Sequence, residues 1–268
     1  RPLAEVFATA RAEGRAALIG YLPAAFPTAS AATRLMEAIV AAGVDIVEVG
    51  LPYSDPLMDG PDIQAAVERA LAAGATTDVV LDTVAAVTSA GATAVVMSYW
   101  NPIERYGLDR FAGRLAEAGG HGVITPDLTI EEAGPWHAAC AAHGLAEIFL
   151  VAPSSTDARI AEVAAATSGF LYAASTMGVT GARTAVSSAA PALVARCRQR
   201  TSLPVAVGLG VSNADQAAEV AGYADGVIVG SAFVRRILAA PDEDAAVEQV
   251  ADLAADLAAG VRRNRPGP

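Results

Sequence analysis

Short runs of β-branched and other apolar residues alternate with longer stretches of helical periodicity along the whole chain. A short apolar run bounded by turn residues is typical of a strand buried in a parallel sheet. On this basis we predict eight strands, at Ala17–Leu22, Asp45–Val49, Ala94–Ser98, Gly122–Ile124, Glu147–Val151, Phe170–Ala173, Val205–Val207 and Gly226–Val229.

The stretches between these strands predict helices with one buried face. Apolar residues recur three or four positions apart from Met36 to Gly43 and from Ile63 to Leu71. Pro61 suits the first position of a helix, and Gly43 and Gly74 suit helix ends.

The ends of the chain and the last helices complete this outline. Ser212, with Asp215 three residues later, is expected to cap the helix after the seventh strand. Residues 1–15 are expected to form an N-terminal helical segment, and residues 262–268 a frayed tail. No linker or low-complexity block interrupts the pattern, so we predict a single domain over residues 1–268.

Strict alternation of strand and helix predicts a parallel sheet covered by helices. About eight such units over this length favour a closed (β/α)8 TIM barrel of the α/β class. A doubly wound open sheet is the alternative. However, no G-x-G-x-x-G motif follows the first strand, where a dinucleotide-binding fold would have one.

Composition narrows the class of partner. Of the 268 residues, 53% are hydrophobic, and 29 acidic against 18 basic residues give a formal net charge of −11. Such an acidic chain lacks the basic surface that nucleic acid or anionic lipid requires, so neither is an expected partner. No apolar run reaches the roughly 18 residues of a membrane span. The N-terminus also lacks the pattern of a secretory signal, which favours the cytoplasm.

Cysteine and histidine spacing predicts neither a metal site nor a disulfide framework. Cys140 and Cys197 are expected to be buried or half-buried thiols. His121, His137 and His143 have no ligand spacing and are interpreted as surface or structural residues.

Glu48 is the first candidate for chemistry, because active sites of barrels lie at the carboxyl ends of the strands. It lies near the end of the second predicted strand, between Val47 and Val49. If its face is the barrel interior, burial would raise its pKa toward the range of a proton-transfer group. A structural ion pair with a lysine or arginine is the competing interpretation.

The segment that follows, Leu51 to Pro61, is longer than a minimal connection of about 2–6 residues and contains Asp55 and Asp59. Long loops at this end of a barrel usually have a function. Asp59, taken alone, could instead cap the helix that begins at Pro61.

Glycine-rich turns near the C-terminus predict an anion site. Gly208 and Gly210 follow the seventh strand, and Gly230 and Ser231 follow the eighth and open a helix. Glycines allow backbone N–H groups to approach an anion, and a helix N-terminus provides free donors. The loops after strands seven and eight are the usual phosphate site of this fold.

Two further segments follow predicted strands and are candidates for a role near the site. The loop from Tyr172 to Arg183 is long and rich in small residues, as a mobile lid would be, although a connection without a role is the alternative. Tyr99 and Trp100, after the third strand, either line an aromatic pocket or pack in the core.

These motifs together resemble the tryptophan synthase alpha subunit family. The resemblance rests on Glu48 followed by Pro52-Tyr53-Ser54-Asp55-Pro56-Leu57-Met58-Asp59-Gly60-Pro61, on Met177-Gly178-Val179-Thr180-Gly181, on Gly208-Leu209-Gly210 and on Gly230-Ser231. It extends from about Tyr21 to Val234. The segment around Ser54 and Pro61 is highly specific, and the glycine pairs are not.

The resemblance implies cleavage of indole-3-glycerol phosphate into indole and glyceraldehyde 3-phosphate. Glu48 matches the acid–base carboxylate and Asp59 the second catalytic carboxylate of the family. Gly181, Gly210, Gly230 and Ser231 match phosphate-binding positions. The residues expected to contact the remainder of the substrate are Tyr172, Thr180, Tyr99 and Asp127.

The resemblance also implies a partner. We expect an α2β2 complex with a tryptophan synthase beta subunit, which would hold pyridoxal phosphate, and no cofactor on this chain. Thr176 departs from the family pattern, in which many members have an arginine, so the closure of the lid is the feature placed in doubt.

Three alternatives stay open at this point. A free-standing lyase of the same family would need the same catalytic residues. A phosphate-binding barrel isomerase would share the glycine turns but would not need the segment from Ser54 to Pro61. A catalytically silent barrel that regulates a partner would have no use for Glu48 and Asp59.

Overall fold

The computed structural model describes residues 1–174, 189–208 and 210–263. Its strands form one sheet, in which all neighbouring strands are parallel. The strands are β1 Ala17–Pro23, β2 Ile46–Gly50, β3 Thr93–Met97, β4 Gly122–Ile124, β5 Ala146–Ile148, β6 Leu150–Val151, β7 Leu171–Ala174, β8 Val205–Gly208 and β9 Gly226–Val229. Every strand predicted from the sequence is present within one residue of its expected bounds, the fifth as β5 and β6.

The sheet closes into a barrel through its fifth strand, which Phe149 divides into β5 and β6. The order of the sheet is β5-β4-β3-β2-β1-β9-β8-β7-β6, so the two halves of one strand form its two ends. Hydrogen bonds continue past the division, because Ser168 N–H donates to the Glu147 carbonyl at 2.8 Å and Tyr172 N–H donates to the Phe149 carbonyl at 3.2 Å. The (β/α)8 prediction is therefore confirmed, and the open-sheet alternative is not.

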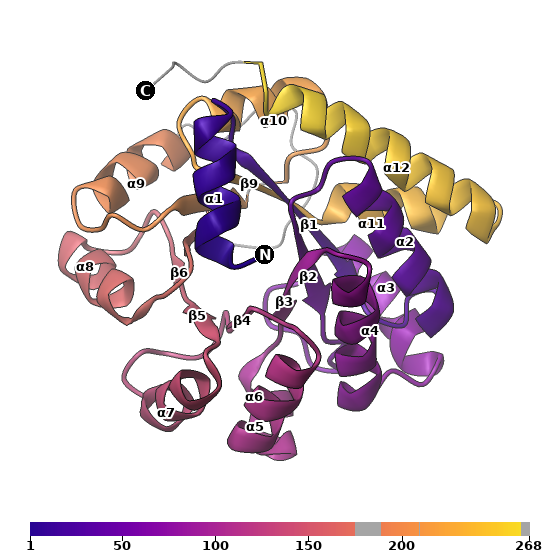
Figure 1. Ribbon diagram of the computed structural model, residues 1–268, viewed down its shortest axis with the longest axis horizontal. Helices are drawn as coiled ribbons and strands as arrows, with labels where there is room; N and C mark the ends of the chain where they lie inside the picture. The colour runs from indigo at the N-terminus through magenta and orange to yellow at the C-terminus, as the bar shows by residue number, and fades with distance from the viewer. Residues whose placement is uncertain (175–188, 209, 264–268) are drawn as a thin grey trace.

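Helices surround the strands as an outer ring, with α1 across one end of the barrel (Figure 1). They are α1 Leu3–Ala12, α2 Ala29–Ala41, α3 Pro61–Ala72, α4 Thr77–Ser89, α5 Trp100–Tyr106, α6 Leu108–Glu117, α7 Gly134–His143, α8 Asp157–Ala166, α9 Ala189–Arg198, α10 Ala214–Ala221, α11 Ser231–Ala239 and α12 Glu243–Gly260.

The predicted helix boundaries hold with one exception. Pro61 is the first residue of α3, and Gly74 lies just beyond its end with a φ of 90°. The predicted cap at Ser212 is wrong by one residue. Asn213 caps α10, its side chain accepting from the Gln216 N–H at 3.0 Å, because Asn213 has the extended backbone of a cap while Ser212 is bonded to the Gln216 side chain.

Two apolar layers hold the barrel together. An outer layer between strands and helices includes Val47 and Val49, and an inner layer fills the barrel with side chains such as Ile46 and Ile124. In α1, which confirms the predicted N-terminal helical segment, Phe7 packs on Phe170 of the interior with ring centroids 5.5 Å apart. This helix closes the end of the barrel opposite the carboxyl ends of the strands.

Within the described residues, no single helix is long and apolar enough to cross a membrane. The pair α3 and α4 reaches that length and composition only when the two are taken together, and they meet at an angle of 105°. The predicted frayed tail at 262–268 lies largely outside the described residues.

Candidate active site

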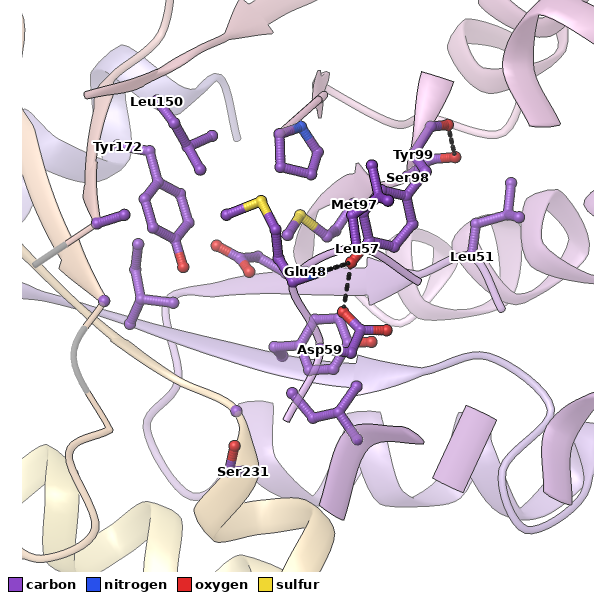
Figure 2. Close-up of a pocket in the computed structure, with 18 of the residues that line it drawn as sticks. Glu48, Leu51, Leu57, Asp59, Met97, Ser98, Tyr99, Leu150, Tyr172 and Ser231 are labelled. Atoms are coloured by element: carbon purple, nitrogen blue, oxygen red, sulfur yellow. Dashed lines mark hydrogen bonds between the residues drawn. The ribbon is translucent and has the colours of Figure 1, made fainter. Parts of the chain in front are cut away.

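A cavity of about 290 Å³ opens at the carboxyl ends of the strands. It contains side chains from nearly every part of the barrel, including Glu48 of β2, Asp59 of the loop before α3, Tyr172 of β7 and Ser231 of α11. Figure 2 shows Glu48 between Tyr172 on one side and the Asp59–Tyr99 pair on the other. The structure thus brings together residues that lie far apart in the sequence.

Glu48 faces the barrel interior, the condition on which the expected rise of its pKa depended. Val47 and Val49 belong to the outer apolar layer, whereas the Glu48 side chain is 1% exposed and lines the cavity. Its Oε1 atom has no hydrogen-bond partner among the described residues. Burial raises the pKa of Glu48 from 4.5 to about 8, because it removes water from the charged form and no cation of the described residues offsets that loss. A structural ion pair, the competing interpretation, is therefore excluded within the described chain.

Asp59 is held by a hydrogen bond rather than by a capping role. The Tyr99 hydroxyl donates to Asp59 Oδ1 at 2.8 Å, and the N-cap of α3 is Gly60, without a side-chain cap. The Gln64 side chain donates to the Asp59 carbonyl at 2.7 Å, which fixes the backbone at the same place. Burial raises the pKa of Asp59, and the bond from Tyr99 opposes that rise.

The start of α5 anchors the loop that carries Asp59. The Tyr99 oxygen accepts from the Met58 N–H at 2.9 Å, and the Asn101 amide donates to the Tyr53 hydroxyl at 2.9 Å. Tyr99 is thus both a lining residue and a contact of Asp59.

Asp127 acts on the same helix rather than on the cavity. Its Oδ1 accepts from the Trp100 N–H at 2.9 Å, and Asp127 is absent from the described residues that line the cavity. Its contact with substrate stays a prediction.

The other end of the cavity has free backbone donors. Helix α11 begins at Ser231 with Gly230 as its N-cap and no side-chain cap bond. Both residues line the cavity, as does Gly210, which has a φ of 79° that favours glycine. Three of the predicted phosphate positions therefore meet in one place. Gly181, Thr180 and Thr176 fall outside the described residues.

Comparison with known proteins identifies the family. A family model described as tryptophan synthase alpha chain matches residues 7–262. The tryptophan synthase alpha chain of Thermobifida fusca is 62% identical over 258 residues, which cover 95% of this chain and 96% of that protein. That of Acidothermus cellulolyticus is 60% identical over 259 residues, covering 97% and 96%. The chain belongs to this family.

The fold of this chain is similar to that of a chain in a solved structure of Mycobacterium tuberculosis tryptophan synthase. It aligns with a TM-score of 0.92 and 53% identity, over 97% of this chain and 98% of that chain. Membership of the tryptophan synthase alpha chain family confirms the predicted lyase of tryptophan biosynthesis on a TIM barrel.

Among the described residues, sequence reasoning missed two polar lining residues of the cavity, Ser98 after β3 and Tyr21 near the end of β1. Alternation could have revealed Tyr21, since it lies two positions after Ile19 of the barrel interior. Room for its ring comes from neighbouring glycines, because a Cβ at Gly50 would lie 2.6 Å from the Tyr21 oxygen. Gly208 provides the same room for Tyr172, because a Cβ at Gly208 would lie 2.5 Å from the Tyr172 oxygen.

Both cysteines are buried, as predicted, and two of the histidines contact carboxylates. Cys140 and Cys197 are buried and free. His137 contacts Glu147 at 2.6 Å and His143 contacts Asp109 at 3.0 Å, both away from the cavity. The described residues contain no group of three or more His, Cys, Asp or Glu that could hold a metal ion.

Proposed function

We propose that this chain cleaves indole-3-glycerol phosphate into indole and glyceraldehyde 3-phosphate in the cavity between Glu48 and α11. The observation that carries the proposal is the pairing of two unlike carboxylates in one cavity. Glu48 is fully buried with a raised pKa, and Asp59 is hydrogen-bonded by Tyr99. Acids in such different surroundings take different roles in catalysis.

Glu48 moves the protons. With a pKa of about 8 it is protonated at neutral pH and can donate to C3 of the indole ring, which turns that carbon tetrahedral. The resulting carboxylate then removes the proton of the hydroxyl on the carbon attached to C3. The carbon–carbon bond breaks, its electron pair restores the aromatic ring, and the hydroxyl carbon becomes the aldehyde. Glu48 ends the cycle protonated, as it began.

Asp59 stabilises the intermediate charge. Protonation at C3 places positive charge on the ring nitrogen, and a fixed carboxylate that accepts from the N–H lowers the energy of that state. Tyr99 keeps Asp59 oriented and favours its charged form. Anchoring through Met58 N–H and Asn101 keeps the loop in place without substrate.

The phosphate binds at the opposite end. The N-terminus of α11 at Gly230 and Ser231, together with Gly210, offers backbone donors and a favourable helix dipole for an anion. A bound phosphate fixes the position of the three-carbon chain, so the indole ring reaches Glu48 and Asp59 in a reactive geometry. Gly181 and Thr180 are proposed to complete this end, and Tyr172 to contact the substrate near Glu48.

We further propose an α2β2 complex with a beta subunit whose pyridoxal phosphate site consumes the indole, and no cofactor on this chain. Leu57 and Met58 support a partner surface, since they are 73% and 44% exposed beside Asp59. The relatives named above are chains of tryptophan synthase, and nucleic acid and membrane remain outside the proposed partners. A cytoplasmic location stays a prediction.

Indole release from indole-3-glycerol phosphate tests the proposal, measured for the chain alone and with excess cognate beta subunit. We expect slow release by the chain alone and faster release with the partner, because partner binding beside the loop around Asp59 is coupled to the cavity. Release at full rate without any response to the partner would favour a free-standing lyase. Absence of release in both assays would contradict the proposed activity.

A further inference from the structure

Tyr21 lines the active cavity, yet neither acid–base chemistry nor the phosphate site accounts for its hydroxyl. It lies on β1 directly opposite Glu48 of β2 in the strand register. Its half-buried ring shares the cavity with Glu48, Asp59 and Ser231. Among the described residues, no hydrogen bond involves its phenol oxygen, in contrast to that of Tyr99.

Glycines on both sides fix the direction in which the Tyr21 ring points. A Cβ at Gly230 would lie 3.2 Å from Cδ1 and 3.4 Å from Cβ of Tyr21, so the root of the side chain packs beside the N-terminus of α11. A Cβ at Gly50 would lie 2.6 Å from the phenol oxygen, so the tip lies at the end of β2. The ring therefore extends from the phosphate end of the cavity toward the carboxylate end.

The proposed substrate has its own polar groups along this same path. A three-carbon chain joins the indole ring to the phosphate and carries two hydroxyls. Glu48 removes the proton of the hydroxyl next to the ring. The second hydroxyl lies between that carbon and the phosphate, takes no part in bond breaking, and needs a hydrogen-bond partner once it leaves water.

We infer that Tyr21 is a specificity-determining residue, whose phenol hydroxyl hydrogen-bonds the non-reacting hydroxyl of the substrate's three-carbon chain. The inference rests on the proposed function and names a contact within that site. Burial, followed by the nearby Asp59, keeps the pKa of Tyr21 well above its usual range, so the phenol remains a donor at neutral pH.

The substitution Tyr21→Phe tests this contact because it removes only the oxygen and keeps the ring beside Gly50 and Gly230. A bond to a non-reacting group is made equally in the ground state and the transition state. We therefore expect KM to rise about 3- to 10-fold while kcat changes less than about twofold. Tyr223→Phe is the matched control, since the Tyr223 hydroxyl likewise has no partner in the described chain but Tyr223 lies outside the cavity.

A second ligand separates the hydroxyl contact from ring packing. An analogue that joins indole to phosphate through a plain propyl chain has no hydroxyl for Tyr21 to bind. Its inhibition constant should be the same for wild type and Tyr21→Phe, within about twofold. Equal weakening of substrate and analogue, a fall in kcat at constant KM, or unchanged kinetics would each overturn the assignment of Tyr21. A wild-type chain that releases no indole even with its partner would instead overturn the proposed function.

Discussion

The hydroxyl of Tyr99 donates a hydrogen bond to Asp59 across 2.8 Å, joining the loop after β2 to the start of α5. The same oxygen accepts from the Met58 N–H, so one phenol fixes both the carboxylate and the backbone next to it. A charged acceptor makes this a comparatively strong bond. The arrangement of the Asp59 loop therefore depends on a residue 40 positions away in the chain.

We expect Tyr99→Phe to lower kcat by about 10- to 100-fold, the effect of losing a hydrogen bond to a charged group. The bond from Tyr99 lowers the pKa of Asp59, so its loss should also move the acid limb of the activity profile to higher pH. Steady-state kinetics across the acid range measures both effects. Tyr106→Phe, outside the cavity, serves as the control, and an unshifted acid limb would contradict the role of Tyr99.

Glu48→Gln and Asp59→Asn should each slow cleavage by roughly 10²- to 10⁴-fold, because one change removes the proton carrier and the other the compensating anion. Neither alters side-chain volume appreciably, so both variants should fold. Single-turnover indole release and circular dichroism measure the two properties. Turnover close to wild type in Glu48→Gln would remove Glu48 from the mechanism.

The activity of the wild-type chain should fall at alkaline pH. Glu48 must begin the cycle protonated, and its pKa is about 8 in the folded chain. The value of kcat/KM should therefore decline above about pH 8, approaching tenfold per pH unit. A profile that rises through pH 8 would mean that Glu48 starts as a base and would reverse the proposed order of proton transfers.

The stability of the fold should respond to the same group. The folded pKa of Glu48 is about 8 and its ordinary value is 4.5, so the native state binds the proton more tightly. The contribution of Glu48 to the free energy of unfolding is fully present below pH 4.5 and is lost as pH rises through 8. The total loss is up to about 5 kcal/mol.

The glutamine of Glu48→Gln cannot lose a proton, so the variant's free energy of unfolding should not fall as pH rises from 4.5 to 8, whereas that of wild type should. The difference in free energy of unfolding between the two proteins should therefore shift in favour of the variant over that range. Urea titrations at several pH values provide the measurement. A gap that is constant with pH would show that Glu48 titrates normally.

Gly210→Val should weaken binding of phosphate-bearing ligands, because a side chain blocks the approach of the backbone and is strained at a φ of 79°. Gly74→Val is the matched control, because Gly74 has a φ of 90° and open space around it and does not line the cavity. Calorimetry with the phosphorylated ligand and its unphosphorylated counterpart separates a loss of phosphate binding from a general effect on folding. Equal weakening of both ligands would assign the effect to folding rather than to phosphate.

Short apolar runs were sufficient to predict the strands, because strands buried on both faces keep apolar residues such as Val47 and Val49. Alternation placed Glu48 on the face opposite these valines, but the structure was needed to show that this face is the barrel interior. The partner of Asp59 could not be predicted, since Tyr99 reaches it only through the adjacency of β2 and β3. The division of the fifth strand at Phe149 likewise has no local signal, as it arises where the barrel closes. The cap of α10 was misplaced because Ser212 and Asn213 are both good capping residues and only the backbone decides between them.

Helix α1 closes one end of the barrel with Phe7 against Phe170, and this limits the routes by which substrate can enter and products can leave. Nothing can pass through the barrel, so substrate and both products use the same opening at the carboxyl ends of the strands. Indole at the carboxylate end and the aldehyde at the phosphate end must leave in sequence or together by that route. Whatever covers the opening therefore decides which product is captured and which returns to solvent.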